Sequence, residues 1–249
     1  MFPDLLDLGF LHLRTYGACM AVGFLLCWQL VEKLSGRKDL SNLLLSLMIA
    51  GVVGSRLAYV IEHWQREFAA HPEAIIRVDQ GGLMFYGGLI LAILVFFAWC
   101  WLKKDHPLKL ADLLTTVIPL GHACGRLGCF FYGCCYGKDS TAWCAVVFPK
   151  GSPSWYEHNY QMVPVLPTQL FEAAALLVLF AALLVIYRRY RAYTAGVYFM
   201  GYAVIRFGME YLRGDPRAAV GPFSISQTIS LAMLLLGGAF LGYSRYYRQ

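Results

Sequence analysis

The chain has 249 residues, of which 59% are apolar and only 14% are charged, and its formal net charge is +6. A soluble domain carries about 45–50% apolar and about 25% charged residues, so this composition exceeds what a soluble core can bury. A disordered chain is also excluded, because it needs low hydropathy and high charge. The basic residues lie between apolar runs rather than in one patch, which argues against nucleic acid as a partner. The sequence therefore predicts an all-α integral membrane protein within a lipid bilayer.

Seven apolar segments are candidates for crossing that bilayer, since about 20 apolar helical residues span ~30 Å of hydrocarbon. We expect them at residues 16–31, 43–61, 81–102, 113–125, 163–187, 194–212 and 220–244. The fourth is short and ends at Arg126. We interpret residues 1–249 as a single seven-helix domain. Residues 122–162, rich in Gly, Tyr, Cys and Trp, are expected to form a small external head within it.

Basic residues predict the orientation, because cytoplasmic loops carry an excess of Lys and Arg. Eleven fall in alternate connections and the C-terminal tail: Lys33, Arg37, Lys38, Lys103, Lys104, Lys109, Arg188, Arg189, Arg191, Arg245 and Arg248. The opposite connections carry seven over much longer segments. We therefore expect the N-terminus outside and the C-terminus in the cytoplasm, as an odd number of spans requires.

Several charged residues fall inside or beside the predicted spans, where each costs at least ~2.5–3.5 kcal/mol and indicates function. They are Arg56, Arg126, Glu172, Arg206, Glu210 and Arg213. Arg206 and Glu210 are four residues apart and share a helix face, as do Glu210 and Arg213 at a spacing of three. The trio could be structural, with Glu210 neutralising the arginines. Alternatively, the arginines bind an anion, because guanidinium groups fit phosphate oxygens in pairs, and a phospholipid head group is the obvious candidate.

Residues 125–137 read G-R-L-G-C-F-F-Y-G-C-C-Y-G and resemble the signature G-R-x-G-N-F-x-N-x-E-x-x-G of the prolipoprotein diacylglyceryl transferases. Further blocks resemble that family in order along nearly the whole chain. They are Tyr16-Gly17, residues 54–59, the double-glycine block that begins at Gly81, residues 167–172, and Gly201-Tyr202 followed by Arg206, Glu210 and Arg213.

The resemblance implies a seven-helix enzyme of the bacterial inner membrane with its site toward the periplasm. Such enzymes transfer a diacylglyceryl group from phosphatidylglycerol to the lipobox cysteine of a prolipoprotein and release glycerol phosphate. Arg126 then corresponds to the arginine that holds the phosphatidylglycerol head, and Arg206 to the second essential arginine. Further residues are expected to bind substrate: Tyr16, Cys129, Cys134, Gln169, Tyr202, Glu210 and Arg213. No metal and no organic cofactor is implied.

The sequence departs from the family pattern at functional positions. Tyr86 replaces the histidine usually assigned as general base, Cys129 replaces the signature Asn, Cys134 the signature Glu, and Leu166 a His. A phenol is a poor base at neutral pH unless nearby arginines acidify it. We therefore expect His122, four residues before Arg126, or an arginine-activated Tyr86 to supply the base. The departures leave two alternatives open: a phospholipid-dependent transferase with another acceptor, and a non-catalytic lipid-binding paralogue.

Five of the eight cysteines crowd the external end: Cys124, Cys129, Cys134, Cys135 and Cys144. One interpretation is a disulfide in an oxidising compartment, for example from Cys134 or Cys135 to Cys144. A second is a reactive thiol activated by Arg126. A third is a metal site, against which the absence of C-x-x-C spacing counts. Packing is the fourth.

Overall fold

The computed structural model describes residues 4–7, 12–69, 71–76, 82–215 and 219–246. The helices are α1 (Thr15–Ser35), α2 (Leu40–His63), η1 (Trp64–Phe68), η2 (Pro72–Ile76), α3 (Phe85–Lys103), α4 (Pro107–Tyr132), α5 (Pro153–Glu157), α6 (Thr168–Tyr190), α7 (Thr194–Glu210) and α8 (Ile225–Tyr246). Short antiparallel pairs join β1 (Asp4–Asp7) to β2 (His12–Arg14), β3 (Val146–Val147) to β4 (Pro164–Val165), and β5 (Ala219–Val220) to β6 (Phe223–Ser224). The predicted all-α class is confirmed; Gly81 and Arg248 lie outside the described residues.

Six helices are long and apolar enough to cross a membrane: Thr15–Ser35, Leu40–Phe68, Phe85–Lys103, Pro107–Tyr132, Thr168–Tyr190 and Ile225–Ser244. They coincide with six of the seven predicted spans. The remaining prediction, residues 194–212, corresponds to α7, whose 17 residues cover about 26 Å at ~1.5 Å per residue. The chain is therefore a multi-pass membrane protein.

Large apolar side chains are exposed along these helices. Leu94 of α3, Val178 of α6 and Leu235 of α8 have 60%, 72% and 79% of their surface accessible. A soluble protein rarely exposes so many, because each costs free energy in water. Hydrocarbon chains of the bilayer cover such surfaces at no cost, which agrees with the composition.

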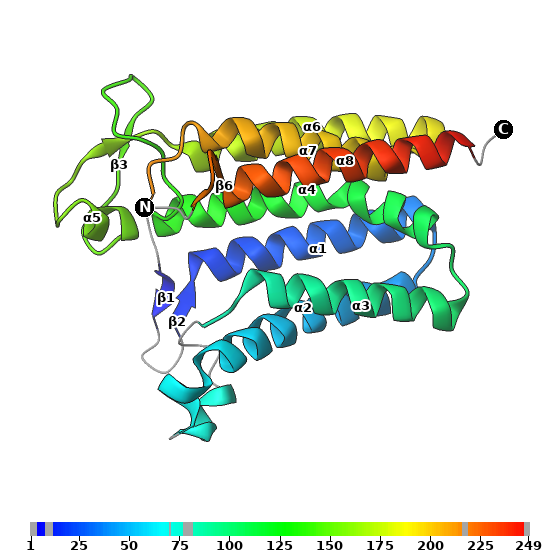
Figure 1. Ribbon diagram of the computed structural model, residues 1–249, viewed down its shortest axis with the longest axis horizontal. Helices are drawn as coiled ribbons and strands as arrows, with labels where there is room; N and C mark the ends of the chain where they lie inside the picture. Colours follow the sequence, from blue (N-terminus) through cyan, green and yellow to red (C-terminus); the bar gives the residue numbers. More distant parts are fainter. Residues whose placement is uncertain (1–3, 8–11, 70, 77–81, 216–218, 247–249) are drawn as a thin grey trace. The chain divides into compact units, whose positions relative to one another are not determined.

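The helices belong to two compact units, one of residues 1–31 and 111–249 and one of residues 32–110. In the first unit, α7 packs against both α6 and α8, and the three run alongside α4 (Figure 1). In the second unit, α2 packs against α3. Glycines permit this second contact, since a Cβ on Gly54 would lie 2.5 Å from the carbonyl oxygen of Gly87. Small residues at such crossings let two membrane helices approach closely.

The fourth helix continues well beyond the predicted end of its span and includes the start of the predicted head, residues 122–132. It ends at Tyr132, and the next residue, Gly133, has a φ of +81°, the left-handed conformation that favours glycine. The head then contains β3, α5 and β4 and lies at the end of α4 beside the first turn of α6 (Figure 1). Helix α5 is capped by Ser152, whose Oγ accepts a hydrogen bond from the Trp155 amide at 3.3 Å.

Candidate functional site

A buried stripe along α6 carries polar side chains into the first unit. Gln169, Glu172, Leu176 and Leu183 are all fully buried, and their spacing places them on one helix face. Glu172 faces α4, where its Oε1 lies 2.9 Å from Nη2 of Arg126. This ion pair explains why α4 can continue past an arginine, because an unpaired buried charge would cost several kcal/mol.

Two aromatic residues adjoin this ion pair. His122, one turn before Arg126 on α4, places Nε2 4.0 Å from the same Glu172 oxygen. The Tyr202 ring of α7 lies 5.2 Å from the His122 ring, within electrostatic range of Arg126 and Glu172. The structure thus brings four predicted or motif residues from three helices into one cluster. Helix α4 includes both His122 and Arg126, which therefore lie one turn apart on the same helix.

The second arginine is held within α7 and by α8. Arg206 Nη2 lies 3.0 Å from Glu210 Oε2, the i,i+4 pair expected from the sequence. The same nitrogen donates a hydrogen bond of 2.7 Å to Ser226 Oγ. Both side chains of the ion pair are almost entirely buried. Arg206 is also within electrostatic range of His122, which links it to the Arg126 cluster.

The third arginine follows α7 and joins that helix end to the head. Arg213 donates Nε to Asp215 Oδ1 and Nη2 to Asp215 Oδ2, each at 2.8 Å. Its backbone forms an antiparallel bridge with Gly137. The sequence placed Arg213 on a face with Glu210, but helix α7 ends at Glu210. The carboxylate bound in this bidentate way is therefore that of Asp215.

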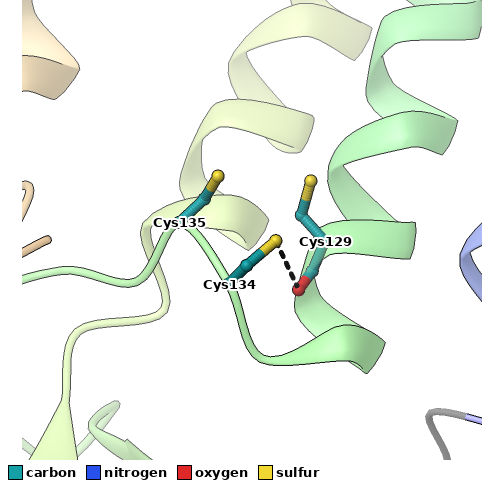
Figure 2. Close-up of side chains that lie close together, drawn as sticks. All are labelled: Cys129, Cys134 and Cys135. Carbon is teal, nitrogen blue, oxygen red and sulfur yellow. Dashed lines mark hydrogen bonds between the residues drawn. The ribbon is translucent and has the colours of Figure 1, made fainter. Parts of the chain in front are cut away.

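Three cysteines converge where α4 ends. The amides of Gly133 and Cys134 donate to the carbonyl oxygens of Phe130 and Cys129 at 3.2 Å each, which is the Schellman pattern of helix termination. This turn folds the chain back, so that the sulfurs of Cys134 and Cys135 lie beside that of Cys129 (Figure 2). All three Sγ atoms are within 4.8 Å of one another.

The first turn of α6 supports this cysteine loop. Gln169 Nε2 donates a hydrogen bond of 2.7 Å to the Cys134 carbonyl oxygen. Thr168 Oγ1 donates one of 2.9 Å to the Cys135 carbonyl oxygen. Gln169 was expected to bind substrate; the structure shows that it braces the loop, while its Oε1 lies buried without a hydrogen-bond partner among the described residues.

All eight cysteines are free thiols, so the disulfide from Cys134 or Cys135 to Cys144 that the sequence suggested is not formed in the structure. Hydrogen bonds from the Cys129 and Cys134 thiols lower the pKa of Cys135, and the Arg213 guanidinium lowers it further. A thiolate at Cys135 is thus favoured by its neighbours, because each of them donates a proton or carries a positive charge.

Tyr16 lies in the first turn of α1 beside the same end of α4, and its ring would lie 2.9 Å from a Cβ at Gly128. An apolar groove of about 350 Å³ lies between the two helices just beyond it. Its lining is mostly apolar: Thr15, Cys19 and Val22 of α1, and Cys124, Leu127 and Phe131 of α4. The groove has the dimensions and chemistry for a hydrocarbon chain.

Tyr86 and Arg56 belong to the second unit. Tyr86 lies in the first turn of α3 with 52% of its surface exposed. The Arg56 guanidinium donates to the carbonyl oxygens of Ala74, Ile75 and Gly82 at 2.6, 2.9 and 3.1 Å. Arg56 therefore ties the segment that follows α2 to the segment before α3.

The sequence alone does not show which residues of this site contact one another. Glu172 stands out in the sequence as a charge within a predicted span, but nothing there assigns it to Arg126. Cys135, Thr168 and Ser226 carried no comparable signal, because their roles depend on a turn and on contacts between distant segments.

The fold and these buried pairs define a multi-pass membrane protein with arginine–carboxylate clusters between its helices. The family model for prolipoprotein diacylglyceryl transferase matches residues 3–243. Phosphatidylglycerol–prolipoprotein diacylglyceryl transferases from Geobacter sulfurreducens and Clostridium tetani are 34% and 31% identical to the chain. The alignments cover 94% of the chain and 92% of the first relative, and 100% of both chains for the second. A relative from Clostridium perfringens, named transferase 2, is 32% identical over 93% of the chain and 90% of its own length. The chain belongs to the prolipoprotein diacylglyceryl transferase family.

Proposed function

We propose that the chain transfers a diacylglyceryl group from phosphatidylglycerol to the thiol of a prolipoprotein lipobox cysteine and releases glycerol phosphate. The observation that carries this proposal is the pair of buried arginines, Arg126 and Arg206, inside the helices of a chain of this family. Arg126 Nε is buried without a hydrogen-bond partner in the described part of the chain, as is Arg213 Nη1. Buried donors of this kind are costly unless a ligand accepts from them.

The reaction breaks the bond between a glyceryl carbon and a phosphate oxygen. Negative charge grows on that oxygen as glycerol phosphate leaves, and forked guanidinium donors stabilise it best. Arg126 and Arg206 take this role, with Glu172 and Glu210 holding them in place. Tyr16, Tyr202 and Arg213 complete the wall of the site. The apolar groove between α1 and α4 takes one acyl chain of the lipid.

A base must accept the proton of the acceptor thiol. His122 is the stronger candidate, because it lies on α4 one turn from Arg126 and its ring contacts Tyr202. Tyr86 is the second candidate, since it stands where the family has histidine. Full transfer activity in both His122→Ala and Tyr86→Phe would exclude them as the base.

For the topology, we propose seven spans with the N-terminus outside, the C-terminus in the cytoplasm and the site facing the periplasm of the inner membrane. Helix α7 is the seventh span. Its 17 residues are short for a membrane, but its charged side chains, Arg206 and Glu210, are buried and pair with each other, so they do not face lipid.

The test is incubation of the purified chain with phosphatidylglycerol and a lipobox peptide, with peptide mass and glycerol phosphate as readouts. We expect the peptide to gain one diacylglyceryl group. Arg126→Ala should lower the rate at least about 100-fold, as for loss of a donor to a developing oxyanion. A folded wild-type chain that modifies no peptide would overturn the proposal. Glycerol phosphate release without peptide modification would identify another acceptor, and lipid binding without turnover a non-catalytic paralogue.

A further inference from the structure

Three sulfur atoms from two segments meet at the end of α4. Cys129 lies in the last turn of the helix, and Cys134 and Cys135 lie in the loop that folds back toward it (Figure 2). Their Sγ atoms are within 4.8 Å of one another, and each side chain is half-buried. Among the described residues, this is the one cluster of three or more His, Cys, Asp or Glu side chains with ligand spacing.

The backbone builds this convergence. Successive side chains of an extended chain point to opposite sides, yet Cys134 and Cys135 both present sulfur to Cys129. Cys135 achieves this with a φ of +65°, which is unfavourable for a residue other than glycine. Thr168 and Gln169 hold the two carbonyl groups of the turn, so the arrangement is fixed before any ligand binds.

The chemistry of three close thiols fits a thiophilic metal ion. Zn²⁺ binds cysteine sulfur at about 2.3 Å in tetrahedral geometry, which requires sulfur atoms about 3.8 Å apart. The observed separations need to close by about 1 Å at most. Three protein ligands leave the fourth position open, which is typical of catalytic rather than structural zinc. The adjacent Arg213 balances the excess negative charge of three thiolates.

We propose that Cys129, Cys134 and Cys135 bind one Zn²⁺ ion whose fourth position takes the sulfur of the acceptor cysteine. The second part of this proposal rests on the proposed function. On binding, the acceptor thiol gives its proton to the base, and a sulfur–zinc bond forms. That sulfur then forms a bond to the glyceryl carbon as the carbon–oxygen bond to phosphate breaks, and the electron pair leaves on glycerol phosphate. Zinc lowers the proton affinity of a bound thiol, so the site itself activates the acceptor cysteine.

Metal content and cobalt spectroscopy of the reduced, purified chain test the site directly. We expect one equivalent of zinc per chain, and Co²⁺ in its place should give sulfur-to-cobalt charge-transfer absorption. Cys129→Ser, Cys134→Ser and Cys135→Ser should each weaken metal binding at least about 100-fold. Cys144→Ser is the matched control, because Cys144 lies in the same head outside the cluster, and it should bind metal as wild type does.

A further variant separates loss of ligands from loss of fold. The double change Cys129→Asn and Cys134→Glu installs the residues of the family signature, so it should fold with an unaltered unfolding temperature and bind no zinc. A lipobox peptide should shift the cobalt spectrum of the wild-type chain, and the same peptide with serine for cysteine should not.

Substoichiometric metal in the reduced wild-type chain, or equal affinity in the serine variants, would overturn the zinc site. An intact mass lower by two hydrogens in place of bound metal would overturn it in favour of a disulfide. A cobalt spectrum that does not change when the cysteine peptide is added would overturn the assignment of the fourth position. Stoichiometric zinc in a chain that transfers no lipid would support the site while rejecting the proposed function.

Discussion

Arg56 and Arg126 stand out equally in the sequence, each an arginine within an apolar segment, yet the two units of the molecule use them differently. In the second unit, three backbone carbonyl oxygens accept hydrogen bonds from the Arg56 guanidinium, one from each of its nitrogens. In the first unit, Arg126 faces a single carboxylate, and its Nε has no hydrogen-bond partner among the described residues. The difference indicates which arginine has capacity left for an anionic ligand.

The comparison teaches that an intramembrane charge is not by itself a functional residue. A guanidinium satisfied by backbone has exchanged its hydration for protein hydrogen bonds and acts as a clamp between segments. A guanidinium paired with one carboxylate is neutralised, but it still offers donors to a phosphate. The predictions that follow separate these two roles.

The largest effect is expected from breaking the Arg126–Glu172 pair. Glu172→Gln should lower the free energy of unfolding by about 3–5 kcal/mol, because it leaves a buried charge without a counter-ion. Combining it with Arg126→Gln should recover most of that stability, but the double variant should transfer no lipid. Thermal unfolding in detergent and the peptide assay measure the two quantities. If the double variant were both stable and active, the pair would be structural only.

The next effect concerns Arg206. Arg206→Lys retains a charge beside Glu210 but loses the forked donors, so we expect kcat/KM to fall on the order of 100-fold with little change in unfolding temperature. Steady-state kinetics with phosphatidylglycerol and peptide measure it. Unchanged kcat/KM would show that Arg206 serves only its ion pair.

A smaller effect, on stability alone, is expected at Arg56. Arg56→Lys cannot satisfy all three carbonyl oxygens, and each lost hydrogen bond costs roughly 0.5–1.5 kcal/mol. We expect a lower unfolding temperature and an unaltered rate per folded molecule. A large fall in kcat at unchanged stability would contradict this structural role and would show that Arg56, like Arg126, takes part in the reaction.

The smallest effect is expected at Arg37, which lies in the loop after α1 and pairs with Asp39 and Asp105 at 2.6 Å. Hydrogen bonds from Arg37 lower the pKa of both carboxyl groups. Their contribution to stability is therefore present above the unfolded pKa, near pH 4, and is lost as pH falls through the lower folded pKa. Arg37→Gln should cost about 1 kcal/mol or less at neutral pH. The unfolding temperatures of variant and wild type should converge as the pH falls through the lowered pKa of these carboxyl groups, and a constant difference would reject the ion-pair explanation.

The sequence by itself determined the all-α membrane class, the positions of the six long spans, the Arg206–Glu210 pair and the family. These follow from composition, from the length of apolar runs and from spacing along one helix, all of which are local properties. The end of α4 was the exception, because Arg126 looked like the limit of a span until its counter-ion was found.

Only the tertiary structure decided that Glu172 pairs with Arg126, that backbone carbonyl oxygens bind Arg56, and that three cysteines without C-x-x-C spacing lie side by side. Each depends on how one segment is rotated against another and on the direction of a single turn. The Cys135 turn cannot be inferred from local preference, because its left-handed conformation is one that cysteine avoids. Contacts from α6 hold it in place, and those exist only once the helices have packed.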